Sequence, residues 1–189
     1  MTPRQLERRR RVLDAVHALL TERPLHEIQV KDIADRAQVS LAAIYRYFAS
    51  KEHLLAETLI DWAEEGGRAY DRRPTAGTAA DRFAAIVRRG LRGYRRSPQY
   101  AELFLEVSAS RDDHAVACMG RLNELVGGGM RDSLRDLDPA MAHDIQRAIG
   151  HAWVGGLFEC VHGRTTFAEL EQTIVAACRL LVEPARVDA

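Results

Sequence analysis

The sequence VKDIADRAQVSLAAIYRYFASK, residues 30–51, decides how this chain folds. It divides into two short amphipathic segments joined by a tight turn that includes Gln38. Apolar residues recur at helical spacing in both segments, and Ser40 stands where it can cap the second one. The stretch therefore predicts a helix-turn-helix, the motif that places its second helix in the major groove of DNA.

The side chains of this stretch fall into an inner and an outer set. The inner set is apolar and spaced to fill a small core between the first three helices: Ile33, Ala34, Ala37, Val39, Ile44 and Phe48. In the outer set, arginine can bind guanine and alanine can pack on a thymine methyl group, whereas tyrosine and lysine suit backbone phosphates. With the preceding arginine run, the outer set predicts DNA contacts by Arg8, Arg9, Arg10, Lys31, Ser40, Leu41, Ala42, Ala43, Tyr45, Arg46, Tyr47 and Lys51. The plainer alternative is that the tyrosines pack between helices and the arginines form a solvated arm.

The charge of the chain is balanced overall but not along its length. Its 189 residues carry 27 Lys and Arg against 27 Asp and Glu. Residues 1–51 hold ten basic and six acidic residues, and the remainder holds seventeen and twenty-one. A basic N-terminal part on an acidic body is the pattern expected of a protein that binds DNA at one end.

Helix signals dominate the chain, and strand signals are missing. Thr2, Pro3 and Gln5 predict the start of the first helix. We expect an all-α fold of about nine helices. It would comprise a DNA-binding domain at residues 1–51, a connecting fourth helix at about 51–70, a boundary at 71–77 and a second helical domain at 78–184.

Three later helices carry their own signals. The seventh is predicted to continue through the glycines at 127–129, because the apolar spacing runs through them; a break there is the alternative. Asp138 followed by Pro139 predicts the start of the eighth, and Thr166 with Glu169 forms a capping box for the ninth.

The first third of the chain resembles the N-terminal domain of the TetR family of bacterial transcriptional repressors. The family pattern I-A-x-x-A-G-V-S-x-G-T-L-Y-x-Y-F-x-x-K-x-x-L is matched in register by Ile33, Ala34, Ala37, Val39, Ser40, Ile44, Tyr45, Tyr47, Phe48, Lys51 and Leu54. Gln38 stands where the family usually has glycine, so a positive φ or an altered turn is expected there. Ala42 and Ala43 replace a Gly-Thr pair, which removes a hydroxyl donor to DNA.

The resemblance implies a ligand-responsive second domain that also forms a homodimer. We expect a large apolar pocket lined by Phe83, Leu103, Phe104, Met119, Leu122, Val126, Met130, Trp153 and Leu157, suited to a hydrophobic small molecule. Small and apolar residues on the last two helices predict a dimer interface at Ile145, Ile149, Ala152, Gly156, Leu170, Ile174, Ala177 and Leu181. The alternative is that these residues belong to a bundle buried inside one chain.

The closing stretch, HAWVGGLFECVHGRTTFAELEQTIVAACRLL, is similar to that of actinobacterial regulators of cholesterol and steroid breakdown, which implies an effector of the steroid or acyl-CoA type. Ligand binding would move the fourth helix as a lever and release a palindromic operator. We expect a cytoplasmic protein with no membrane span, no cofactor, no metal and no enzymatic activity. A ligand-free architectural DNA-binding protein and a small helical enzyme are the competing hypotheses.

Overall fold

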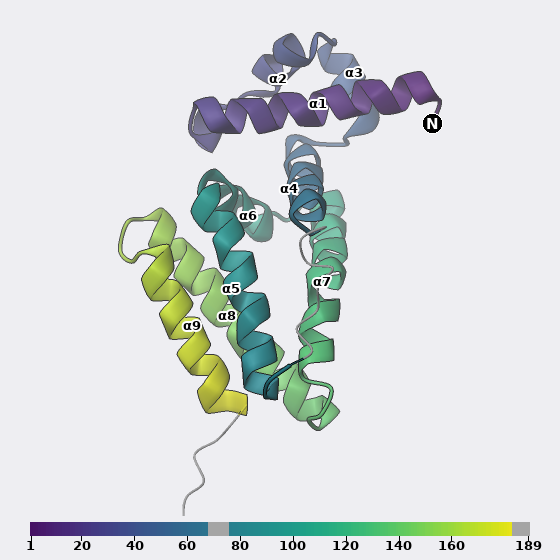
Figure 1. Cartoon of the computed structure of the whole chain (residues 1–189). Coiled ribbons are helices and arrows are strands. Elements are labelled where there is room, and N and C mark those ends of the chain that lie inside the picture. The colour runs from purple at the N-terminus through teal and green to yellow at the C-terminus, as the bar shows by residue number, and fades with distance from the viewer. Residues whose placement is uncertain (68–75, 183–189) are drawn as a thin grey trace, which may run out of the picture. The chain divides into compact units, whose positions relative to one another are not determined.

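A computed structural model describes residues 1–67 and 76–182 of the chain, and this part contains nine α-helices, one short 3-10 helix and no strand (Figure 1). The elements are α1 (Pro3–Glu22), η1 (Leu25–Glu27), α2 (Val30–Ala37), α3 (Leu41–Tyr47), α4 (Lys51–Gly67), α5 (Ala79–Arg96), α6 (Gln99–Ala109), α7 (Asp113–Ser133), α8 (Pro139–Val161) and α9 (Phe167–Val182). The all-α prediction is confirmed. The expected end of the fourth helix at residue 70, most of the boundary at 71–77 and the last residues of the second domain, 183–184, lie outside the described residues.

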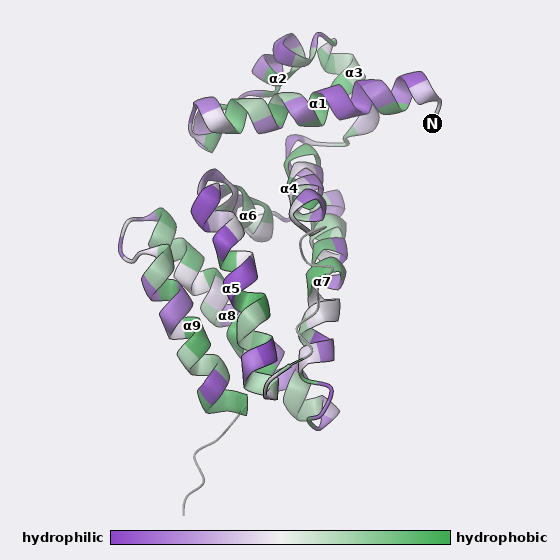
Figure 2. Cartoon of the chain, viewed as in Figure 1, coloured by the Kyte–Doolittle hydropathy of each residue, from purple (hydrophilic) through white to green (hydrophobic). Residues whose placement is uncertain are grey.

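The helix starts follow the capping signals of the sequence. At α1 the Thr2 side chain accepts the Gln5 N–H, and the Gln5 side chain accepts the Thr2 N–H in return. Figure 2 shows that α1 is mostly hydrophilic toward its N-terminus and more hydrophobic in its second half. The buried residues of α1 begin at Val12. The helix α7 continues without a break through the glycines at 127–129, as its apolar spacing predicts.

The chain divides into two compact units whose limits differ from the predicted domains. The first unit comprises Met1–Glu65 and Glu102–Leu122, and the second comprises Gly66–Ala101 and Asn123–Ala189. Part of α6 and the first half of α7 therefore pack with the N-terminal helices. The reason lies in α4, because its residues 54–60 are buried on every face and Arg121 of α7 supplies a partner for the buried Glu57.

In the first unit α1, α2 and α3 contact one another around a small apolar core. The predicted inner set forms this core: Ile33, Ile44 and Phe48 are fully buried, Ala34 and Ala37 nearly so, and Val39 is half-buried. Burial of such side chains contributes about 2 kcal/mol each for the larger ones.

In the second unit α9 packs against both α5 and α8. Gly156 of α8 lies directly under Leu170 of α9, since a Cβ added to Gly156 would come 1.9 Å from Leu170 Cδ1. The buried Arg82 of α5 donates hydrogen bonds to the Gly77 and Ser133 carbonyl oxygens, and so ties the end of α7 to the start of α5. Among the described residues, no helix combines the length and apolar character needed to cross a membrane.

Candidate nucleic-acid interface

The turn between α2 and α3 sets the direction of the second helix of the motif. Gln38 ends α2 with φ 54° and ψ 48°, in the left-handed region that usually holds glycine. Its N–H donates to the Ala34 and Asp35 carbonyls, and the Val39 N–H donates to the Ala34 carbonyl. The Ser40 hydroxyl then accepts the Ala43 N–H at 3.1 Å and begins α3. The positive φ expected at Gln38 is therefore present.

One face of α3 is exposed although it carries large side chains. Leu41, Ala42, Tyr45 and Arg46 occupy adjacent positions on a helix of 3.6 residues per turn. Leu41 is 44% exposed and Tyr45 is 51% exposed. The Arg46 guanidinium lies 5.2 Å from the centre of the Tyr47 ring and donates to its hydroxyl, which orients the side chain. An apolar and basic surface of this kind is suited to base edges in the major groove.

The other predicted DNA residues form two groups. In one group the side chains are at least partly exposed to solvent, and in the other the charged groups have partners within the first unit. Lys31 is exposed, and Ala43, Tyr47 and Arg8 are half-buried. Lys51 Nζ donates to the Ile28 carbonyl oxygen at 2.7 Å, so its ammonium holds η1 against the start of α4.

Arg9 and Arg10 also have internal partners. Arg9 Nη2 lies 2.6 Å from Glu57 Oε2, and Arg10 pairs with Asp61 and Glu65 at 2.7 and 2.9 Å. Both arginines thus neutralise carboxylates of α4, a role that the sequence pattern did not suggest because those partners lie about fifty positions away.

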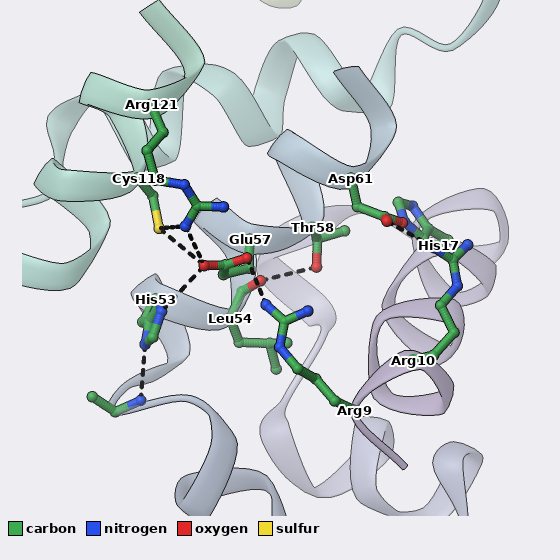
Figure 3. A network of polar contacts seen from close by, with 11 residues as sticks. Arg9, Arg10, His17, His53, Leu54, Glu57, Thr58, Asp61, Cys118 and Arg121 are labelled. Atoms are coloured by element: carbon green, nitrogen blue, oxygen red, sulfur yellow. Dashed lines mark hydrogen bonds and ion pairs between the residues drawn. The ribbon is translucent and has the colours of Figure 1, made fainter. Parts of the chain in front are cut away.

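Glu57 is the centre of a polar cluster that sequence reasoning missed (Figure 3). Its carboxylate accepts from Arg9 of α1 and from Arg121 of α7, and Cys118 Sγ lies 3.6 Å from Oε1. Burial acts to raise the pKa of Glu57, but the hydrogen bond from Arg121 and the charges of both arginines outweigh it and hold the pKa below its ordinary value. The available signal was an acidic residue inside the apolar run LLAETLI, residues 54–60.

His53, Glu57 and Cys118 bring donor atoms within 4.8 Å of one another, close enough to consider a metal site. The hydrogen bonds of His53 and Glu57 argue against it. His53 Nδ1 accepts the Ala49 N–H, which leaves the ring proton on Nε2, the atom that faces Glu57. Both oxygens of Glu57 already accept from arginine side chains, Oε2 from Arg9 and Oε1 from Arg121. The cluster is therefore a hydrogen-bond network of α4 and α7.

The predicted pocket residues are distributed over both units. Leu103, Phe104, Met119 and Leu122 belong to the first unit, and Phe83, Val126, Met130, Trp153 and Leu157 to the second. Phe83, Leu103, Leu122 and Leu157 are buried, and the others are half-buried. Two hollows of about 260 and 330 Å³ in the first unit are lined by other residues, many of them charged.

The residues predicted for a dimer interface lie mostly inside the second unit. Ile145, Ile149, Leu170 and Ile174 are buried within the single chain, and Ala152, Gly156 and Ala177 are half-buried. Of the predicted set, Leu181 is exposed. Gly156 of α8 serves close packing against Leu170 of α9. The large apolar side chains that the two helices leave exposed are Met141, Val154, Phe158, Val161, Leu180 and Leu181.

The motif, its exposed helix face and the helical second unit define a DNA-binding transcriptional regulator of the helix-turn-helix class. Two family models match the chain: "Bacterial regulatory proteins, tetR family" over residues 12–58 and "Tetracyclin repressor-like, C-terminal domain" over residues 77–181. The chain belongs to the tetR family, as the resemblance of its N-terminal third predicts.

Similar proteins are found among transcriptional regulators of actinobacteria. The HTH-type transcriptional repressor KstR of Mycolicibacterium smegmatis is 28% identical over 180 residues, which cover 94% of this chain and 88% of that protein. KstR of Rhodococcus jostii is 27% identical over 181 residues, with coverages of 94% and 84%.

Two solved structures show the same fold. A TetR transcriptional regulator from Rhodococcus sp. RHA1 has a TM-score of 0.81 at 26% identity and covers 96% of this chain and 99% of its own. The regulator FadR of Bacillus subtilis, solved in complex with stearoyl-CoA, has a TM-score of 0.67 at 18% identity, with coverages of 92% and 97%.

Proposed function

We propose that the chain is a homodimeric repressor that binds a palindromic DNA operator and is released from it by a hydrophobic effector. The exposed face of α3 carries the proposal, because Leu41, Tyr45 and Arg46 are presented together on a helix held by a complete helix-turn-helix. Arg46, Leu41, Ala42 and Ala43 read base edges. The partner of this repressor is double-stranded operator DNA, and we place the protein in the cytoplasm. We assign no enzymatic activity to it.

Contacts to the phosphate backbone come from side chains around that face. Lys31, Tyr45 and Tyr47 flank the base-reading residues and suit phosphate oxygens. Among the predicted arginines near the N-terminus, Arg8 is assigned to a phosphate contact. Arg9, Arg10 and Lys51 instead support the helices that carry the interface, because their charged groups already have partners inside the first unit.

The dimer interface is assigned to the exposed apolar stripes of α8 and α9. Val154, Phe158 and Val161 recur at helical spacing on α8, and Leu180 and Leu181 are exposed on α9, Leu180 to 71%. Exposed apolar stripes of this kind mark an interaction surface. A second copy is the partner that operator reading requires, because each recognition helix reads one half-site of a palindrome.

The effector is assigned to the steroid or acyl-CoA class. The closing stretch of the chain resembles regulators of steroid breakdown, and a protein of the same fold was solved with stearoyl-CoA. Binding among the predicted apolar residues of the second unit, which are Phe83, Val126, Met130, Trp153 and Leu157, would favour a state in which the two recognition helices no longer match the operator. Stearoyl-CoA and a steroidal acyl-CoA thioester are the probes, with free CoA as the control. Operator affinity unchanged by either thioester would contradict this effector class.

Operator binding is tested first, by fluorescence anisotropy with DNA from the region flanking the chain's own gene. The expected result is selective binding that weakens steeply with salt, because phosphate contacts release counterions. Salt-sensitive binding without sequence preference would identify an architectural DNA-binding protein instead. The variant Arg46→Ala should lose selectivity and keep most of its salt dependence, since the side chain is assigned to bases.

A further inference from the structure

Glu57 of α4 accepts hydrogen bonds from side chains of two other helices, α1 and α7. Its side chain is 11% exposed. Oε2 accepts from Arg9 of α1 at 2.6 Å, and Oε1 accepts from Arg121 of α7 at 2.7 Å (Figure 3). Two charge-assisted bonds on one buried carboxylate tie α1 and α7 to the same side chain of α4, and such bonds are about twice as strong as neutral ones.

The contact with Arg9 continues to the end of the recognition helix. The Arg9 guanidinium lies 5.1 Å from the centre of the Phe48 ring, over its face. Phe48 is fully buried, directly follows α3 and donates its N–H to the Ile44 carbonyl. A side chain of α7 is thereby connected to the C-terminal end of α3 through Glu57 and Arg9.

A second connection runs beside the first and ends at the same place. His114 of α7 stacks on His53 of α4 with 4.9 Å between ring centres. His53 meets Phe48 edge-on at 5.9 Å and accepts the Ala49 N–H at 3.0 Å. His53 Nε2 lies 3.6 Å from Glu57 Oε1, which joins the two connections.

We propose that Glu57 is a positioning residue of the DNA-binding helices, because its carboxylate transmits the placement of the first half of α7 to the end of α3. Removal of Arg121 leaves the buried carboxylate under-satisfied and loosens the anchor of the Arg9 contact with Phe48, and removal of Arg9 deletes that contact outright. The orientation of Tyr45 and Arg46, one turn earlier on α3, depends on that anchor. This inference rests on the proposed operator binding and adds the means by which α7 influences it.

The test compares Arg121→Met with Arg131→Met in the full-length protein. Both variants remove an exposed positive charge from α7, but Arg131 lies outside the network. Arg121→Met is expected to weaken binding to the selected operator DNA by about tenfold, which is within the usual range of coupling between sites. Its affinity for non-operator DNA and its salt dependence should remain those of the wild type, because Arg121 is not a phosphate contact. Arg121→Lys should restore part of the loss.

A double-substitution cycle shows whether the effect passes through the carboxylate. If Glu57 transmits it, Glu57→Gln combined with Arg121→Met should bind the operator no more weakly than Glu57→Gln alone. Additive losses would overturn the proposal. So would equal losses for operator and non-operator DNA, or Arg121→Met behaving like Arg131→Met. A wild-type protein that shows no selective binding would overturn the proposed function as well.

Discussion

Gln38 holds the turn between α2 and α3 in a left-handed backbone conformation, where a Cβ atom is sterically costly. Gln38→Gly is therefore expected to raise the free energy of unfolding by about 1 kcal/mol, measured from urea denaturation curves. Gln38→Ala is the matched control, because it removes the side chain beyond Cβ and keeps the steric cost. If the glycine variant is no more stable than the alanine variant, the strain is relieved elsewhere.

The cysteines differ in access and acidity. Burial raises the pKa of Cys118 and Cys178 to about 11, whereas Cys160 is half-buried and its pKa is raised less. At pH 8 a disulfide reagent should label Cys160 first and leave the other two until the protein unfolds, as peptide mass spectrometry would show. The raised pKa values favour the folded state below pH 9, and this contribution is lost as the pH rises toward 11. Early labelling of Cys118 would contradict its placement.

Individual side-chain partners are where the sequence was least informative. The arginine run near the N-terminus and Arg46 are chemically alike, so the sequence pattern could assign them all to DNA. Only the fold brings Glu57 and Asp61 next to Arg9 and Arg10, because that encounter depends on how α1 crosses α4. The inner residues were predictable, since helical spacing alone puts Ile33, Ile44 and Phe48 on the buried side.

At the level of helices, Gly156 sets the distance between α8 and α9. Gly156→Ala forces the buried Leu170 to move, and the expected cost is about 1–3 kcal/mol of stability, read from thermal or urea unfolding. Gly128→Ala is the control: it lies in α7 with nothing within 4 Å of the added Cβ, and there alanine should be neutral or stabilising by up to about 1 kcal/mol. Equal behaviour of the two variants would show that α9 can shift freely.

The packing face of α8 that includes Gly156 illustrates why the helices could be predicted from the sequence while the helices that they pack against could not. Ile145, Ile149 and Gly156 fit a close-packed neighbour whether that neighbour is α9 of the same chain or a helix of a second copy. The sequence contains the packing face but not the identity of the helix that covers it. In the structure α9 of the same chain meets Gly156, and other side chains of α8 remain exposed.

For the whole molecule, the exposed stripes of α8 and α9 predict a dimer that single charges can dissociate. Leu180→Asp and Phe158→Asp should lower the mass measured by light scattering from that of two chains to that of one. Operator affinity should fall by about a hundredfold or more, because linked half-sites gain that much from simultaneous binding. Val116→Asp is the control, since Val116 is a comparably exposed apolar residue of α7 outside these stripes. Dimers that persist in both variants would place the interface elsewhere.

The first unit is assembled from two separate stretches of sequence, and this limits how regulators of this design can be recombined. A chimera that joins residues 1–67 of this chain to the effector-binding part of a relative would bring a foreign segment against α4. Glu57 would then face residues that were never matched to it, and Arg9 would lose the arrangement that anchors it to Phe48. Grafts intended to change operator choice while keeping the original sensor need to carry residues 102–122 with the N-terminal helices.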